Sequence, residues 1–530
     1  MEEEDMQQQE SSPKRIKRRQ DDGFRSRSRS RGIVTLSDDI LEYIFSYLSI
    51  KLAIKIGTLS SRFRNSWIYS RNLDFDEEFA EGQSREEFIR IVDRVLKLHM
   101  GRKVCRFRLF FDPSEKVLQV DEWIRFAAMK GVEEVDLDFS AGSERILIYK
   151  IPDFLLDCGS VMVLKLTLCE FMPPLISFNG FGSLTTLSLS RVDVTDQILH
   201  SVFQTCLLLE NLDLNKCLEL DNLRISARNL RRFKKLKITD CKNLYCLKID
   251  APTLHSLHYS GNGKLMFSFG STSNLKDAML DFTVSMFRGF GETLYMENLP
   301  FKLVHVKILT VSSIFLQGLS PKYVNGELKA IQFCLHNLKE FQLLMETVSY
   351  CNPYDIALFL KNCPWLERIF IDLKGFSFYH GIYWELHAKQ PLAQLGCKFQ
   401  HLKSVKLNGF KFEELEMLLV KFVLEKAIVL ETLFLVPDKN QYKITYTGDM
   451  QIGISREVQM GSSRIGKDLG KVWPELGNAL GPDCEIEIGS IVAGPVLGER
   501  DQTSSPALEV DEVEAEDREN QGSADHGDQV

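Results

Sequence analysis

The stretches LENLDLNKC (residues 209–217) and FKKLKITDC (residues 233–241) decide the fold of this chain. Both follow the pattern L-x-x-L-x-L-x-x-C, with phenylalanine in the first apolar position of the second, and Cys217 and Cys241 are 24 residues apart. This pattern and period are typical of leucine-rich repeats, in which a short strand and its turn recur. Small buried thiols pack well at the turn position. The two stretches therefore predict neighbouring units of a solenoid.

Similar apolar triplets occur on both sides of these units. They are Val104-Phe107-Leu109, Val132-Val135-Leu137, Val161-Leu164-Leu166 with Cys169, Leu184-Leu187-Leu189 with Val192, Leu303-Val306-Ile308, Leu338-Phe341-Leu343, Leu366-Ile369-Ile371, Leu402-Val405-Leu407 and Leu430-Leu433-Leu435. Leu244-Leu247-Ile249 and Leu254-Leu257-Tyr259 lie only ten residues apart, so we expect no helix there. Each unit has an apolar strand that its neighbours must cover. The pattern predicts an α/β horseshoe.

A compact apolar block, VTLSDDILEYIFSYLSIKLAIKIGTLSSRFRNSW, precedes the repeats at residues 34–67. Apolar residues at helical spacing run from Ile40 to Leu48 and again from Ala53 to Trp67, and Ser37 is a suitable N-cap, so we expect three short helices. About forty residues bury too little apolar surface to be stable alone. The block is either a docking module or an ordinary helical cap on the solenoid.

The order of residues in this block resembles a plant-type F-box. The residues that carry the likeness are Leu36, Asp38, Asp39, Ile40, Leu41, Ile44, Leu48, the run Leu59-Ser60-Ser61-Arg62-Phe63-Arg64, Trp67, and Asn72-Leu73-Asp74-Phe75-Asp76. The family usually has proline where Ser37 stands and tryptophan where Phe63 stands. Both replacements keep the apolar stripe, and serine suits a helix start. We therefore expect the docking function to survive.

Two further segments are similar to regions found in the same group of proteins. Residues 399–436 resemble an FBD-type C-terminal domain, through His401-Leu402-Lys403, Gly409-Phe410 and Leu430-Glu431. The segment Phe88 to His99 resembles the stretch that follows the F-box. The predicted organisation is a disordered basic arm (1–31), an F-box (32–76), a linker helix and leucine-rich repeats (77–398), an FBD-like terminal repeat (399–440) and a mostly disordered acidic tail (441–530).

The resemblance implies a receptor subunit of a Skp-cullin-F-box ubiquitin ligase, in which the F-box binds a Skp-type adaptor and thereby a cullin-RING ligase. The expected adaptor-binding residues are Leu36, Ile40, Leu41, Ile44, Leu48, Leu59, Ser60, Phe63 and Trp67. Such a subunit supplies proximity and needs neither a catalytic side chain nor a cofactor. No local signature marks a nucleophile, and the paired glycines at 261–263 and 289–291 lack the setting of a phosphate loop.

Residues that flank the two inward apolar positions of each strand point to the concave face, because side chains alternate along a strand. On this reasoning an unidentified protein substrate contacts Glu134, Asp136, Asp138, Asp213, Lys235, Lys237 and Arg368. This face is predicted to be acidic toward its N-terminal part and basic near the middle. A charged stripe of this kind would set association rate and register more than affinity.

Composition places the chain among soluble intracellular proteins. It has 530 residues, 44% of them hydrophobic, and a net charge of −8 that hides a basic segment at residues 14–31 and an acidic end after residue 499. We find no signal peptide, no membrane-spanning run and no CxxC pair. The basic arm suggests nuclear import, so the nucleus, the cytoplasm or both are expected.

Two other functions remain open from the sequence. A leucine-rich scaffold whose F-box no longer docks would explain Ser37 and Phe63. An RNA-associated nuclear protein would use the Arg-Ser repeats of residues 25–31, but the chain lacks the aromatic strand motif of RNA-recognition domains, which makes nucleic acid an unfavoured partner. Adaptor binding separates the ligase receptor from both.

Overall fold

The computed structural model describes residues 37–59, 61–142, 148–173, 181–283, 296–320, 322–324, 327–329, 331–347, 349, 351–378, 392, 395–437, 444–445, 459–460 and 485–488. The basic arm, most of the acidic tail, Leu36 and Ser60 therefore lie outside the described residues.

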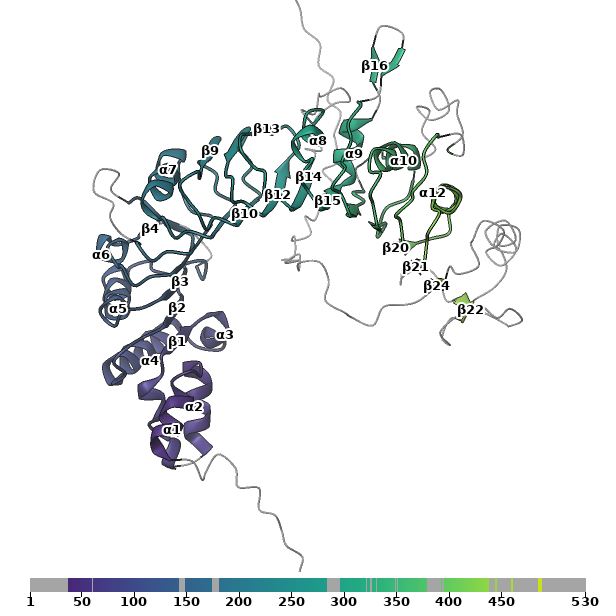
Figure 1. The fold of residues 1–530 in the computed structure, drawn as a ribbon. Helices are drawn as coiled ribbons and strands as arrows, with labels where there is room; N and C mark the ends of the chain where they lie inside the picture. Colours follow the sequence, from purple (N-terminus) through teal and green to yellow (C-terminus); the bar gives the residue numbers. More distant parts are fainter. Residues whose placement is uncertain are drawn as a thin grey trace, which may run out of the picture.

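A single sheet of fifteen strands runs through the molecule, and all of its strand pairs are parallel (Figure 1). In spatial order the strands are β1 (Asn72–Phe75), β2 (Arg106–Phe110), β3 (Glu134–Asp138), β5 (Val163–Thr167), β7 (Thr186–Ser190), β8 (Asn211–Asn215), β10 (Lys235–Thr239), β12 (Ser256–Asn262), β14 (Asp277–Thr283), β15 (Ile308–Ser312), β18 (Glu340–Leu344), β19 (Arg368–Asp372), β20 (Ser404–Phe410), β21 (Thr432–Pro437) and β24 (Glu485–Ile488). Sequence order and spatial order agree, as expected of a solenoid.

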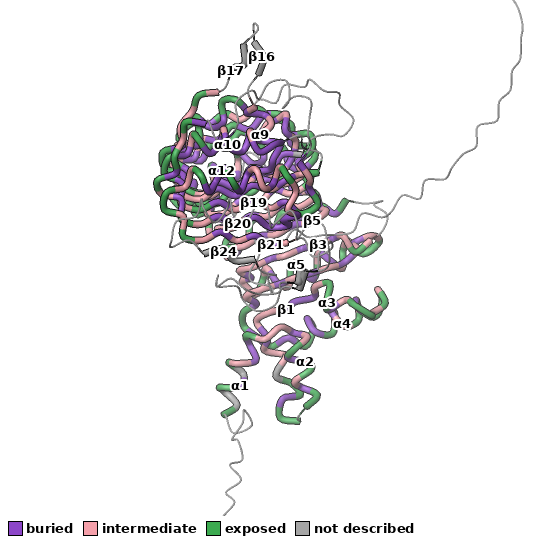
Figure 2. Tube along the Cα trace, turned by 90° about the vertical axis from the view of Figure 1, so that its right-hand side faces the viewer, coloured by how far each residue is buried: buried purple, intermediate pink, exposed green. Residues whose placement is uncertain are grey.

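Helices cover the outer side of this arch at both ends. They are α3 (Glu77–Ala80), α4 (Arg85–Leu98), α5 (Val117–Met129), α6 (Asp153–Leu156), α7 (Asp196–Thr205), α8 (Leu299–Lys302), α9 (Ser313–Leu319), α10 (Pro353–Lys361) and α12 (Glu414–Lys426). The apolar triplets fill the space between helices and sheet, where buried positions concentrate in Figure 2. None of the described helices is long and apolar enough to cross a membrane.

In the middle of the arch, a second sheet replaces the helices. It contains β9 (Asn222–Ser226), β11 (Cys246–Asp250) and β13 (Met266–Phe269). In the main sheet, the register partners Leu212, Leu236, Leu257 and Ala278 are 24, 21 and 21 residues apart, which leaves too little chain for a helix. The expectation that this region lacks helices is confirmed, but Leu247 and Ile249 belong to the back sheet rather than to a unit of the main sheet.

The remaining short strands form small pairs outside these two sheets. They are β4 (Tyr149–Lys150) with β6 (Cys169–Glu170), β16 (Lys322–Val324) with β17 (Glu327–Lys329), and β22 (Ile444–Thr445) with β23 (Gln459–Met460). Strand β24 lies in the segment expected to be mostly disordered, and it extends the main sheet by pairing with β21.

Two details of the repeat prediction are corrected. The inward residues of β15 are Leu309 and Val311, so the triplet proposed at Leu303-Val306-Ile308 was displaced by three residues. The leucine pattern did not predict strand β14, because Ala278 stands at a position where the pattern has leucine. Cys169, Cys217 and Cys241 are buried at the turns as predicted. The residues just before them, Leu168, Lys216 and Asp240, adopt left-handed backbone conformations that reverse the chain.

Candidate functional site: the N-terminal helices and the concave face

The N-terminal block forms two α-helices and two short 3₁₀ helices, where three short helices were predicted. They are α1 (Asp38–Phe45), α2 (Ile50–Leu59), η2 (Ser61–Phe63) and η3 (Ser66–Tyr69). Leu41, Phe45, Ala53 and Phe63 form a small separate core, in which the rings of Phe45 and Phe63 are 5.4 Å apart. Phe63 stands where the F-box family usually has tryptophan, and here it is a buried residue of this small core.

The predicted adaptor-binding residues divide into two groups. Leu41 and Phe63 are buried inside the block, and Ile44, Leu48 and Trp67 are partly buried, so these residues build it. Ile40 and Leu59 are exposed by 48% and 80%. Sequence reasoning missed three exposed apolar residues, Tyr43, Tyr47 and Leu52. Their signal is spacing in the sequence. Tyr43 lies three residues after Ile40 in α1, and Tyr47 lies four residues further on, in the turn after that helix. Leu52 precedes Leu59 by about two turns of α2.

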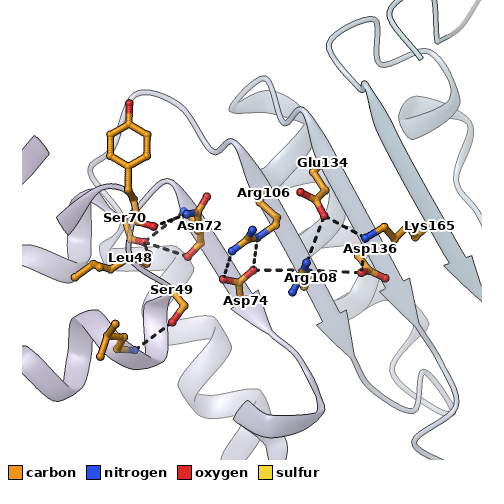
Figure 3. Close-up of polar contacts among 12 residues, drawn as sticks. Leu48, Ser49, Ser70, Asn72, Asp74, Arg106, Arg108, Glu134, Asp136 and Lys165 are labelled. Atoms are coloured by element: carbon orange, nitrogen blue, oxygen red, sulfur yellow. Dashed lines mark hydrogen bonds and ion pairs between the residues drawn. The ribbon is translucent and has the colours of Figure 1, made fainter. Parts of the chain in front are cut away.

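Hydrogen bonds join this helical block firmly to the first strand. The hydroxyl of Ser70 donates to the carbonyl oxygen of Leu48 at 2.9 Å, and the side-chain amide of Asn72 donates to that of Tyr47 at 2.8 Å (Figure 3). His99 contacts the carbonyl oxygen of Ser70 through Nε2 at 2.8 Å, and burial lowers the pKa of His99, which favours its neutral form as donor. Ile50, the first residue of α2, lies in the main core. The block is therefore a fixed extension of the solenoid.

The concave face begins with a ladder of alternating charges (Figure 3). Arg106 donates two hydrogen bonds to Asp74, at 2.7 and 2.9 Å. Further along, Arg108 and Lys165 flank the acidic pair Glu134 and Asp136 from neighbouring strands. These four contacts measure 3.5 Å (Arg108–Glu134), 3.7 Å (Arg108–Asp136), 3.4 Å (Lys165–Glu134) and 3.8 Å (Lys165–Asp136). Burial raises the pKa of Asp136, and Lys165 and Arg108 oppose that effect.

The ladder corrects the prediction of an acidic N-terminal face. Glu134 and Asp136 lie at outward strand positions as expected, but the neighbouring basic side chains already neutralise them. The sequence contained the signal, because each partner lies one repeat away at a register-matched position: Arg108 opposes Asp136, and Asp136 opposes Lys165. Opposite charges on facing positions stabilise neighbouring strands.

The other predicted substrate-face residues also lie at strand positions that point away from the buried core, toward the concave face. Asp138 aligns with Thr167, Lys237 lies 3.7 Å from Asp213, and Arg368 donates to Glu340 at 2.8 Å. Lys235 is exposed and acts on Asp277 through its charge, without an ion pair within 4 Å among the described residues. Between the two charged regions, amide and hydroxyl groups bond to each other from strand to strand, as in Asn211 with Thr186 at 3.1 Å. Much of the concave face is therefore internally paired.

A comparison with known protein families identifies the family of this chain. A family model described as the LRR domain of At1g61320/AtMIF1 matches residues 95–463, which is more than half of the chain. The chain belongs to this family. The match begins in α4 and includes every strand of the main sheet from β2 to β21.

Relatives of the At1g61320 family carry F-box names. The chain is 32% identical to the putative FBD-associated F-box protein At1g61330 of Arabidopsis thaliana, over 79% of this chain and 94% of that protein. It is 31% identical to the FBD-associated F-box protein At1g61320 of the same plant, over 80% and 93%. The F-box/FBD/LRR-repeat protein At1g13570 is 24% identical over 76% and 89%. The predicted family resemblance is thus confirmed.

The described residues offer no arrangement for metal chemistry. Across them, no three His, Cys, Asp or Glu side chains gather as a set of metal ligands. Cys217 contacts the carbonyl oxygen of Leu189 at 3.5 Å, and Cys241 contacts that of Thr239 at 3.6 Å. These thiols pack against the turns. The candidate site therefore has two parts. Exposed apolar residues lie on the N-terminal helices, and a long polar surface covers the concave face.

Proposed function

We propose that this protein is the substrate-recognition subunit of a Skp-cullin-F-box ubiquitin ligase. The observation that carries the proposal is that four apolar residues of α1 and α2 are exposed, Ile40, Tyr43, Leu52 and Leu59, on a block that is fixed to a repeat solenoid. Exposed apolar side chains gathered on a small block favour a protein partner. The F-box names of the relatives favour a Skp-type adaptor as that partner.

The two groups of predicted residues would then have different tasks. Leu41, Phe45 and Phe63 pack the two helices together, whereas Ile40 and Leu59 would contact the surface of the adaptor. The concave face would bind a protein substrate, and the Ser70 and Asn72 hydrogen bonds would hold the adaptor at a fixed position relative to that substrate. Ubiquitin transfer would then benefit from a raised effective concentration.

Co-purification with a Skp-type adaptor tests this proposal. We expect the intact chain to bind and an Ile40→Ala plus Leu59→Ala variant to bind at least about tenfold more weakly, because truncating two interface side chains removes about 1.4 kcal/mol or more. Both residues are exposed, so the free protein should unfold at the same urea concentration as the parent.

A matched control replaces two exposed apolar residues outside the helical block. Leu118→Ala plus Met129→Ala changes α5, which lies beyond α4 from α1 and α2 (Figure 1), and should leave adaptor binding unchanged. If the intact chain fails to bind any Skp-type adaptor, the ligase proposal is wrong and a leucine-rich scaffold becomes the better account. Equal loss in both variants would point to nonspecific adhesion.

A further inference from the structure

A row of basic residues lies along the edge of the main sheet where the strands begin. This basic rim consists of Lys234, His255, Lys276, Lys307 and Lys339, one from each of five successive strands. Backbone N–H groups join each residue to the carbonyl oxygen of the one before it, at 2.9, 3.0, 2.7 and 2.8 Å. The side chains are therefore held about one strand spacing apart, near 4.8 Å.

The rim carries charge that the described part of the chain does not neutralise. Its two ends are paired, Lys234 with Glu210 at 3.0 Å and Lys339 with Glu367 at 2.6 Å. Lys276 and Lys307, in the middle, have no carboxylate within ion-pair distance among the described residues. The nearest acidic residue in sequence, Asp277, points to the concave face and accepts a hydrogen bond from Ser256 at 3.0 Å.

After Lys339 the same row continues with Glu367, Lys403 and Glu431, and an exposed aromatic residue, Trp365, lies near Lys339. Trp365 is 46% exposed and stacks on His401, with ring centroids 4.4 Å apart and planes 14° apart. Lys339 Nζ lies 5.6 Å from the Trp365 ring. Ile428 and Val429 continue the exposed apolar surface toward β21. Tryptophan is among the residues enriched at protein-binding hot spots.

We propose that the chain's own segment LEVDEVEAEDRE, residues 508–519, occupies this edge. The segment has apolar residues at Leu508, Val510 and Val513, and it carries seven acidic residues against one arginine. Its carboxylates match the basic charge that the rim presents before β10 to β18. Such matching of charge favours association and fixes register.

Strand β24 brings this segment within reach. It begins at Glu485 on the edge of the sheet that carries the rim and ends at Ile488 toward the opposite edge, beside β21. Three strand spacings separate β24 from β19 and six separate it from β14, or about 14 and 29 Å. Twenty residues separate Ile488 from Leu508, and a chain of that length can span up to roughly 66 Å, which is enough to return along the four residues of β24 and reach β19 to β14. Residues 508–519 can then lie along the rim without strain.

A bound tail would shield the rim from other acidic segments, and salt would release it because the screening length falls below about 5 Å near 0.5 M. The contact is intramolecular and does not depend on the adaptor. Its failure and the failure of the proposed ligase function are therefore separate results.

Photo-crosslinking in the full chain tests the contact. A benzophenone amino acid placed at Ala515 should form adducts with peptides that contain Lys276, Lys307 or Trp365, mapped by mass spectrometry on monomeric protein. A Trp365→Ala, Lys276→Glu, Lys307→Glu variant should lose these adducts by roughly tenfold, as should the parent in 0.5 M salt. All three replaced residues are exposed, so folding should persist.

A matched variant controls for net charge. Lys216→Glu plus Lys242→Glu makes the same change in charge at exposed turns on the opposite edge of the sheet, and it should keep the adducts. Adducts on residues 14–31, adducts between two molecules, or adducts unchanged by the rim variant would each overturn the proposal. So would the absence of adducts from monomeric protein.

Discussion

Gly409 lies in β20 with a φ of +76°, where the register with β21 shifts by one residue. A Cβ atom at this position would lie 2.6 Å from the backbone nitrogen of Lys374, which cannot move without breaking the neighbouring turn. Gly82 has almost the same φ, +78°, but a Cβ there would meet nothing within 4 Å. Alanine at Gly82 would therefore add backbone strain alone, whereas alanine at Gly409 would add both backbone strain and a steric clash.

We expect Gly409→Ala to lower the free energy of unfolding by about 3 kcal/mol, because left-handed strain and overpacking add. Gly82→Ala should cost only about 1 kcal/mol, from strain alone. Urea unfolding of both variants measures the difference. Equal losses would mean that the β20 turn moves aside, contrary to the close approach seen here.

Glu416 is completely buried in the first turn of α12, and its carboxylate accepts the backbone N–H of Lys411 at 2.7 Å. Burial raises its pKa from 4.5 to about 7, although the backbone hydrogen bonds oppose this shift. Because the folded pKa lies above the unfolded one, the group contributes stability that is fully present below pH 4.5 and is lost as the pH rises through 7.

The free energy of unfolding should therefore fall by roughly 2–3 kcal/mol through this group between pH 5 and pH 8. Glu416→Gln should flatten that part of the pH profile, whereas Glu414→Gln, at an exposed position of the same helix, should leave it unchanged. Thermal unfolding at several pH values provides the measurement. Parallel profiles for the parent and Glu416→Gln would show that Glu416 titrates normally.

At the scale of elements, the charge ladder holds the first strands together. Asp74 has a side chain only 5% exposed, and without Arg106 its one ionic neighbour among the described residues is Arg108, 3.8 Å away. Arg106→Ala should cost about 2–3 kcal/mol, since it leaves a buried carboxylate poorly paired. Lys103 forms an exposed pair with Glu133, so Lys103→Ala should stay within about 0.5 kcal/mol.

Equilibrium unfolding of the N-terminal repeats, followed by hydrogen exchange at β1 and β2, distinguishes these outcomes. Similar small losses in both variants would mean that water replaces Arg106 at Asp74 without penalty. An Asp74→Asn, Arg106→Ala double variant should recover part of the loss, because the buried charge is then gone.

Elements were predictable from the sequence where the repeat pattern was complete. Strands β8 and β10 followed directly from their leucines and turn cysteines. Strand β14 did not, because alanine replaces leucine, and β11 was placed in the main sheet because its spacing satisfies the same pattern from the other side. A local pattern indicates that a strand has apolar residues facing the core, but it does not tell whether the strand belongs to the main sheet or to the second sheet.

At the scale of the whole molecule, the candidate site was only partly predictable. The apolar stripes located the helical block, yet which residues face solvent depends on how α1 packs on α2, so Tyr43 and Leu52 were missed and Leu41 proved buried. The concave residues were placed correctly, but their neutralisation by Arg108 and Lys165 depends on register between strands about thirty residues apart, which a single repeat does not encode.

Pairing of β24 with β21 has a consequence for synthesis. Translation proceeds from the N-terminus, so β21 emerges and offers an unpaired parallel edge about fifty residues before β24 can cover it. At about 5–20 residues per second, that edge stays open for several seconds on every nascent chain. During this interval two chains on one polysome can join edge to edge, so β24, the last of the described strands to be made, protects each chain against aggregation.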